Sequence, residues 1–425
     1  MIIVDGEVLL KKPKPKCAYP LLFRLVDNEV HSAIPVPGIE NKIPGSLLIK
    51  EAAGNFDIGK IGKEEDQVRV VITRGKVRRK QRPGGSGAKD GYATDGYILK
   101  NNVWVHDPVI VTPVKTDLFS RSRGIFETDL VADQCIYIIG LGSVGGPVAT
   151  ELGRLGVNLV LMDPDRIDLH NVVRNPPGLS DIGRHKVKYY REVILDTNPS
   201  ASVEIHAVKA CWENRDLIRE NVRKCDFTAY LADDGEGREI TNKICMEENK
   251  PILAAGAFRR AYGCQILIAR QPGISPCLQC FKMTLPDQAF DQEISNEEQA
   301  ERLAYSDRPV PIEPGLSNDI APVNQMVVKL ILQELLKGKK TTLRSLDEDL
   351  VAPWYLWLNR REAETQYAKL KPLEFGMDGM RILRWYGVDF ERNTHCPACG
   401  DFEESIAEAE GIEITPEDIA RFTQG

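Results

Sequence analysis

The sequence predicts an α/β fold with a mostly parallel sheet, preceded by a smaller domain rich in β-strands. Apolar strand patterns alternate with helical patterns from residue 135 onward, and such alternation is typical of a parallel sheet covered on both faces. A glycine run, 140–145, joins the first of these strands to the first helix. Two Cys-x-x-Cys pairs, one after the predicted sheet and one near the C-terminus, indicate a four-thiolate metal site.

The N-terminal 115 residues have a different texture from the rest. Short β-rich runs are separated by Pro/Gly stretches and show little helical periodicity; examples are 20–26, 68–73 and 102–106. We therefore expect a β-rich N-terminal domain over residues 1–115, and its role stays open.

The α/β domain is predicted over residues 116–400. Its expected strands are 135–140, 158–163, 203–208, 227–231, 266–269 and 354–358. Its expected helices are 144–155, 185–196, 214–223, 237–249 and 321–338. A C-terminal helical tail is expected over residues 401–425, with a capped helix that opens at Thr415.

Composition excludes several classes of protein. The net charge of −7 over 425 residues makes the whole molecule a poor electrostatic match for nucleic acid. No apolar run approaches the roughly 20 residues that a membrane span needs. The first residues, MIIVDGEVLLKKPKPK, lack a small-residue cleavage site for secretion, so we expect a cytoplasmic protein.

The glycine run indicates a nucleotide site. Gly140, Gly142 and Gly145 follow a strand and open a helix, so the backbone can approach a phosphate at the positive end of that helix. Asp163 ends the next strand, where a carboxylate can accept hydrogen bonds from a ribose. This Rossmann-type arrangement alone is most often read as a site for NAD.

The residues that follow make the resemblance more specific. After the acidic strand end comes an Asn-x-x-Arg element, Asn171 and Arg174, and then a Gly-x-x-Lys element that ends at Lys186. Asp233 later precedes a helix. In this order the chain resembles the ThiF/MoeB family, the bacterial relatives of ubiquitin-activating enzymes, over roughly residues 119–400. The resemblance implies ATP-dependent adenylation of a carboxylate, in which two anions must be brought together.

That chemistry suits these residue types. Arg174 and Lys186 would neutralise the triphosphate, Asp233 would hold Mg²⁺, and Asn171 would orient phosphate or the attacking carboxylate. The resemblance also implies that Arg121, before the first strand, reaches the phosphates of a partner subunit. Taken singly, Arg174 and Lys186 could be solvated surface charges, and Asp233 could be a helix N-cap.

The cysteine pairs predict a zinc site that closes the fold. Four thiolates complete a tetrahedral site without an open position for chemistry, and the pairs also recur in the ThiF/MoeB family. The ligands would be Cys277, Cys280, Cys396 and Cys399. A redox role for the pairs is the alternative, and disulfides fit a chain without an export signal less well.

One feature departs from the family pattern. Smaller relatives carry a thioester cysteine between the two zinc pairs, and here no cysteine occurs from residue 281 to 395. A thioester would therefore need Cys211, which lies before a predicted helix, or Cys264. Either could equally be an ordinary, partly buried thiol. Alternatively, the adenylate passes directly to a separate thiol protein, persulfide or amine.

The resulting hypothesis is an enzyme that uses ATP and Mg²⁺ to adenylate the C-terminal glycine of a ubiquitin-like or sulfur-carrier protein. Transfer to a thiol would follow, on a cysteine of the chain or on a conjugating-type enzyme, and relatives imply a homodimer. A bacterial ubiquitin-like conjugation pathway is slightly favoured over sulfur transfer for cofactor or tRNA modification. A small-molecule or tRNA-base carboxylate is a weaker candidate substrate. An NAD-dependent oxidoreductase and an inactive scaffold subunit are the alternatives from other classes.

Overall fold

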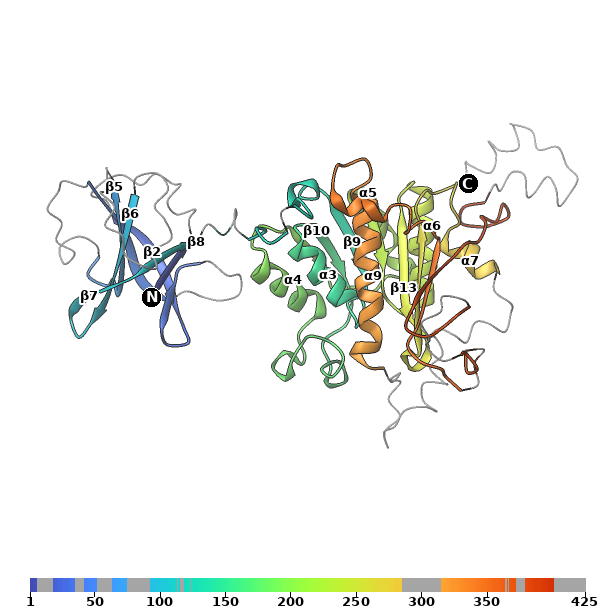
Figure 1. Cartoon of the computed structure of the whole chain (residues 1–425), viewed down its shortest axis with the longest axis horizontal. Coiled ribbons are helices and arrows are strands. Elements are labelled where there is room, and N and C mark those ends of the chain that lie inside the picture. The colour runs from blue at the N-terminus through green and yellow to red at the C-terminus, as the bar shows by residue number, and fades with distance from the viewer. Residues whose placement is uncertain are drawn as a thin grey trace, which may run out of the picture. The chain divides into compact units, whose positions relative to one another are not determined.

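A computed structural model of the chain describes residues 1–5, 18–34, 42–51, 63–74, 92–112, 114, 118–122, 124–284, 315–363, 365, 367–371 and 379–400. The chain divides into two compact units, Met1–Arg123 and Gly124–Gly425 (Figure 1). We describe each unit by itself. Among the described residues, no helix combines the length and apolar character that crossing a bilayer requires. The helix expected near Thr415 lies outside the described residues.

The first unit is built on an eight-stranded sheet in the order β7-β6-β5-β4-β2-β3-β1-β8. Its strands are β1 (Ile2–Asp5), β2 (Ala18–Val26), β3 (Val30–Ser32), β4 (Ile43–Glu51), β5 (Val68–Arg74), β6 (Tyr92–Lys100), β7 (Val103–Asp107) and β8 (Val109–Thr112). Apolar side chains from five of these strands form its core, among them Ile2, Phe23, Leu47, Val70 and Ile98.

The second unit contains another eight-stranded sheet, in the order β11-β10-β9-β12-β13-β14-β15-β16. Its strands are β9 (Cys135–Ile139), β10 (Asn158–Met162), β11 (Val203–His206), β12 (Phe227–Tyr230), β13 (Ile252–Ala257), β14 (Gly263–Ala269), β15 (Trp354–Leu358) and β16 (Trp385–Val388). The first five strands pair in parallel, and the sheet turns antiparallel from β13 to β16.

Helices cover both faces of this sheet. They are α3 (Gly145–Arg154), α4 (Lys186–Thr197), α5 (Arg215–Lys224), α6 (Gly235–Glu247), α7 (Leu278–Thr284) and α9 (Ser317–Leu335). Helices α3, α4 and α9 share one core with Ile136 and Ile138 of β9 (Figure 1). Helices α5, α6 and α7 share the other core with Tyr137 and Ile139. The alternation along β9 therefore explains why the strand reads as a continuous apolar run.

Small residues on α3 let it lie close to α4. A Cβ added at Gly146 would be 2.1 Å from the Tyr190 hydroxyl oxygen, and one added at Gly153 would be 2.5 Å from Ile194. Tyr190 and Ile194 belong to α4, and both are buried. Because no side chain stands between the helices at these points, the first turn of α3 is fixed against the sheet behind the glycine loop.

Two details of the second unit differ from the sequence-based expectation. Helix α9 begins at Ser317 rather than at residue 321, and Pro322 lies inside it. A start at residue 321 would place Pro322 in the first turn, where its missing N–H breaks no helical hydrogen bond. In the structure the preceding turn is held from outside, since Arg360 donates to Asp319 at 2.7 Å. Strands β13 and β16 and helix α7 had no counterpart in the prediction.

Candidate nucleotide site and cysteine centre

The main cavity lies where the strand order of the sheet reverses. Strands β10 and β11 follow β9 on one side of the sheet, and β12 and β13 lie on its other side. The loops after β9 and β12 therefore diverge. Ligands of open α/β sheets bind in the crevice at such a switch point. Here a cavity of about 460 Å³ opens there, which is within the size range of small-molecule sites.

A tight glycine loop forms one wall of the cavity. Gly140 has a φ of +90°, and a Cβ at this position would lie 2.5 Å from the Ala232 backbone nitrogen. Gly140 and Gly142 line the cavity, whereas Gly145 packs behind the loop against Gly140. Asn324 of α9 donates a hydrogen bond to the Ser143 carbonyl at 3.0 Å. The loop is therefore held from behind and presents its backbone to the cavity.

Asp163, directly after β10, is bound to this loop. Its carboxylate accepts hydrogen bonds from the backbone N–H of Leu141 at 2.6 Å and of Asp165 at 2.8 Å. Burial raises the pKa of Asp163, and the nearby Lys186 and these hydrogen bonds oppose that rise. Asp163 thus fixes the loop to the end of β10, and the ribose contact that the sequence suggested for it stays a prediction.

Positive groups reach the cavity from the crossover between β10 and α4. Lys186, the first residue of α4, is buried and donates to the Asp165 carboxylate at 2.7 Å. Its Nζ lies 4.0 Å from Asp163. Arg174 and Asn171 also line the cavity. The Asn171 side-chain oxygen accepts the Asp168 N–H at 2.9 Å, which closes a capping box on the 3₁₀ turn η2 (Leu169–Asn171).

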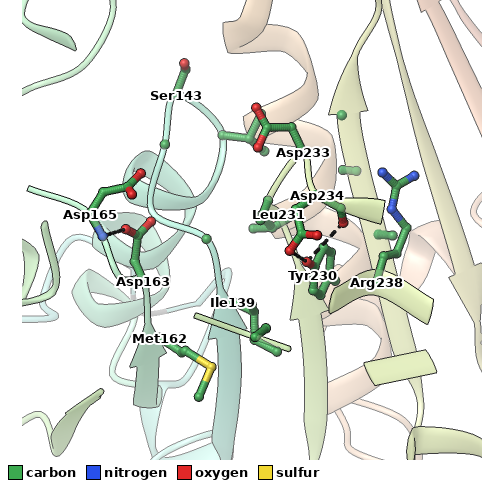
Figure 2. Close-up of a pocket in the computed structure, with 18 of the residues that line it drawn as sticks. Ile139, Ser143, Met162, Asp163, Asp165, Tyr230, Leu231, Asp233, Asp234 and Arg238 are labelled. Carbon is green, nitrogen blue, oxygen red and sulfur yellow. Dashed lines mark hydrogen bonds between the residues drawn. The ribbon is translucent and has the colours of Figure 1, made fainter. Parts of the chain in front are cut away.

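Asp233 and Asp234 divide two roles between them at the end of β12. Asp234 is the N-cap of α6, and it accepts hydrogen bonds from the Gly237 N–H at 3.3 Å and the Tyr230 hydroxyl at 3.1 Å. The helix N-cap role considered for Asp233 is therefore filled by Asp234. Figure 2 shows Asp233 across the cavity from Asp163 and Asp165, on the side formed by β12 and α6. A carboxylate at this position can contact a cation that is bound between the two walls.

Some cavity residues were not assigned a role from the sequence. Arg238 of α6 and Gln265 of β14 line the cavity, and Asp165 is the hydrogen-bond partner of Lys186. The sequence signal for Asp165 was its place two residues after the acidic strand end. Arg121 belongs to the first compact unit, so its role stays a prediction.

The four predicted zinc ligands come together in the second unit. The Sγ atoms of Cys277, Cys280, Cys396 and Cys399 all lie within 4.8 Å of one another. Three of the separations are 3.9, 3.6 and 3.3 Å, close to the value of about 3.8 Å for sulfurs that surround one zinc at about 2.3 Å. Asn242 and the Asn393 backbone N–H donate to two of these sulfurs at 3.5 and 3.4 Å, and hydrogen bonds of this kind orient metal ligands. The donor set therefore fits Zn²⁺.

The two thioester candidates have very different surroundings. Cys264 is fully buried within β14, and burial raises the pKa of its thiol. Cys211 is partly exposed and precedes the 3₁₀ turn η4 (Trp212–Asn214). It follows Ala210, which lines the cavity, and the Asn214 amide donates to its sulfur at 3.4 Å. Of the two, Cys211 is the thiol that a protein substrate could reach in this conformation.

Comparison with known proteins identifies the family of this chain. The family model described as the ThiF family matches residues 126–368, which include the glycine loop, the cations of the cavity and Asp233. The chain belongs to the ThiF family. This result confirms the resemblance that the motifs suggested.

Several named proteins are similar to part of this ThiF-family protein. The ubiquitin-like modifier-activating enzyme 5 of Caenorhabditis briggsae is 28% identical over 159 residues, which are 35% of this chain and 37% of the relative. The sulfur carrier protein ThiS adenylyltransferase of Escherichia coli is 28% identical over 173 residues, 39% and 67% of the two chains. The adenylyltransferase and sulfurtransferase MOCS3 of C. briggsae is 29% identical over 182 residues, 41% and 44%. The chain thus spans just over a third of enzyme 5 and under half of MOCS3.

Solved structures also resemble the chain. MccB of E. coli with the compound MccA-N7isoASN covers 64% of this chain and 69% of its own, with 16% identity and a TM-score of 0.46. PaaA covers 61% and 84%, with 19% identity and a TM-score of 0.43.

Proposed function

We propose that this ThiF-family protein uses ATP to adenylate the C-terminal carboxylate of a ubiquitin-like or sulfur-carrier protein. One observation carries the proposal: a buried lysine, an arginine and an aspartate converge on a cavity that a glycine loop opens at the sheet's switch point. The names of the relatives, which are activating enzymes and adenylyltransferases, support the same activity. The NAD alternative leaves this set of residues without a task.

The reaction assigns a role to each group. The glycine loop and the start of α3 would bind phosphate through backbone N–H groups. Lys186 and Arg174 would neutralise the triphosphate while an oxygen of the substrate carboxylate attacks the α-phosphorus. The bond to the bridging oxygen then breaks and pyrophosphate leaves. Such a reaction depends mainly on positioning and charge. Asp233 would hold Mg²⁺, which would offset the charge on the departing pyrophosphate.

Pyrophosphate exchange into ATP, with candidate carrier proteins that end in glycine, tests this function. We expect exchange by the wild type and loss of at least about a hundredfold in Asp233→Ala, the scale seen when a key electrostatic group is removed. Asp216→Ala is the matched control, because that carboxylate is 88% exposed. Undiminished exchange in Asp233→Ala would remove Asp233 from the mechanism. Binding of a reduced nicotinamide in place of ATP would replace the proposal with an oxidoreductase, and failure to bind either would favour a scaffold.

We further propose that two copies associate beside the cavity. Apolar side chains on the crossover that carries Arg174 are exposed to solvent: Val173 is 84% exposed, Leu179 69% and Leu169 56%. Large exposed apolar groups that gather on one segment are typical of protein interfaces. Light scattering should therefore report a dimer that Val173→Asp dissociates. Ile274→Asp, at a residue 74% exposed elsewhere, should leave it intact. A monomeric wild type would contradict the proposal.

Two routes can follow adenylation: a thioester on this chain, or direct transfer to another molecule. If the chain forms its own thioester, Cys211 is the thiol we assign to it, because Cys264 is enclosed by the core. A reducible adduct with the carrier protein, absent in Cys211→Ser and present in Cys264→Ser, would support this route. An adduct that survives in Cys211→Ser would overturn the assignment. Transfer of the adenylate to a conjugating-type enzyme or a sulfur donor would leave both variants active.

A further inference from the structure

A second pair of cysteines lies at the ends of the parallel strands that are opposite to the nucleotide cavity. Cys135 begins β9, Cys225 lies two residues before the start of β12, and their Sγ atoms are 3.0 Å apart. The two strands are hydrogen-bonded neighbours in a register that pairs Ile136 with Phe227. Because the cavity follows the C-terminal ends of β9 and β12, this pair stands at their N-terminal ends. It belongs neither to the nucleotide site nor to the zinc centre.

The two thiols differ in access and in acidity. Cys225 is 1% exposed, whereas Cys135 is partly exposed. The hydrogen bond shared by the two sulfurs lowers the pKa of Cys135, and Lys224 lowers it further against the opposing effects of burial, Asp226 and Glu204. The same hydrogen bond, together with burial, raises the pKa of Cys225. The accessible sulfur of Cys135 is thus the one that an oxidant can reach, with the buried Cys225 sulfur beside it.

This arrangement of an accessible thiolate beside a second thiol is the one that oxidation-sensitive cysteines require. The separation of 3.0 Å is already shorter than ordinary sulfur contact, so closing it to a bond of about 2.05 Å needs a movement of only about 1 Å. Such a movement lies within reach of side-chain rotation, and the backbone register of β9 and β12 stays as it is.

We propose that Cys135 and Cys225 form an oxidisable dithiol that a peroxide converts into an intramolecular disulfide. The Cys135 thiolate attacks one peroxide oxygen, the O–O bond breaks, and the other oxygen leaves as hydroxide, which takes up a proton to become water. Cys135 is then a sulfenic acid. The Cys225 sulfur gives up its proton and attacks the Cys135 sulfur, and the S–O bond breaks with loss of water. Each sulfur is oxidised by one electron, and the peroxide is reduced to two waters.

The disulfide would connect the two strands that lead into the nucleotide cavity. Strand β9 continues into the loop of Gly140, and β12 continues towards Asp233. The disulfide would therefore link the two strands, β9 and β12, whose spacing sets the distance between these two walls. It does not depend on which carboxylate the enzyme activates, so this inference stands apart from the proposed function.

Graded exposure of the full-length, zinc-loaded protein to hydrogen peroxide tests the proposal. After an acid quench, unreacted thiols are alkylated under denaturing conditions, and peptides are mapped by mass spectrometry. We expect a linked Cys135–Cys225 peptide, with Cys135 consumed about tenfold or more faster than Cys264, whose buried thiol holds its proton. Cys245 is the second internal reference, because burial raises its pKa to about 12.

Two variants sharpen the result. Cys225→Ser should abolish the linked peptide and leave a sulfenic acid on Cys135 that dimedone traps, whereas Cys245→Ser should give the wild-type yield of disulfide. The proposal would be overturned if Cys135 and Cys225 remained reduced, and were therefore fully alkylated, at peroxide doses that oxidise Cys264. A disulfide that joins two chains would also overturn it. If Cys225→Ser does not fold, the wild-type peptide map decides alone, because it needs no variant.

Discussion

Replacing Gly145 by alanine should disturb the nucleotide loop more than any other single methyl group added to it. A Cβ at Gly145 would lie 1.8 Å from the Gly140 carbonyl oxygen. Reaching an acceptable contact near 3.0 Å requires a displacement of more than about 1 Å. Gly140 cannot give way easily, because its N–H donates to the Met162 carbonyl at 2.8 Å and the space beside it is so narrow that an added Cβ would lie 2.5 Å from the Ala232 nitrogen. The strain therefore falls on the first turn of α3.

The expected cost follows from this geometry. Overpacking a filled site costs about 1–3 kcal/mol and occasionally more, and a clash between backbone atoms belongs at the upper end. We expect Gly145→Ala to lose about 3 kcal/mol of unfolding free energy, a large part of the 5–15 kcal/mol typical of a domain. A loop displaced by about 1 Å should also bind ATP more than tenfold less tightly, since 1.4 kcal/mol corresponds to a factor of ten.

Two further glycines provide matched controls. An added Cβ meets no atom within 4 Å at Gly142 or at Gly178, so either alanine variant should stay within about 0.5 kcal/mol of the wild type. Gly142 lines the cavity whereas Gly178 does not, so only Gly142→Ala should weaken ATP binding. Urea unfolding followed by tryptophan fluorescence measures stability, and titration calorimetry measures ATP affinity. A Gly145→Ala protein as stable as Gly142→Ala, with unchanged ATP affinity, would refute this account of the loop.

Three other predictions concern metal, pH and oxidation. Cys396→Ser should lose the zinc measured by elemental analysis and unfold at lower urea, whereas Cys211→Ser should keep one zinc per chain. Hydrogen bonds from two α5 arginines lower the pKa of Glu248 to about 2, below its unfolded value near 4.3. Its ionised form therefore stabilises the fold above about pH 4.5, an effect lost as pH falls towards 2, and Glu248→Gln should flatten the acid limb of a stability profile. The proposed disulfide, which joins residues 90 apart, should stabilise the oxidised chain by up to about 4 kcal/mol in urea unfolding.

Local motifs predicted well because their geometry is local. A glycine run between a strand and a helix forms a tight loop at a strand's end, and this reasoning selected Gly140 and, at the end of the next strand, Asp163. Asp233 was selected through the family resemblance. All three line a common cavity in the structure. The Cys-x-x-Cys pairs were equally readable, since each places two thiols on one turn, and two such turns complete a tetrahedral set.

Long-range relations were beyond the same reasoning. Asn324 reaches the Ser143 carbonyl across 181 positions of sequence, and no spacing rule connects the two. The division of labour between Asp233 and Asp234 depends on which of two adjacent carboxylates faces Gly237. Helix α9 starts before Pro322 because Arg360, far along the chain, holds Asp319. The first and third cases are decided by tertiary contacts that override a local preference, and the second by a choice between two adjacent carboxylates that the sequence pattern does not distinguish.

The placement of the cavity connects these observations. Strands β9 and β12 are neighbours in the sheet although about ninety residues separate them, and each ends in a group that the proposed chemistry needs: a phosphate-binding loop after β9 and Asp233 after β12. The pairing of these two strands therefore sets the positions from which the two walls begin. Contacts that fix this pairing, including the cysteines at its far end, should control the nucleotide site without touching it. Under the two proposals, the sheet would connect an oxidisable dithiol at one end of these strands to the adenylation site at the other.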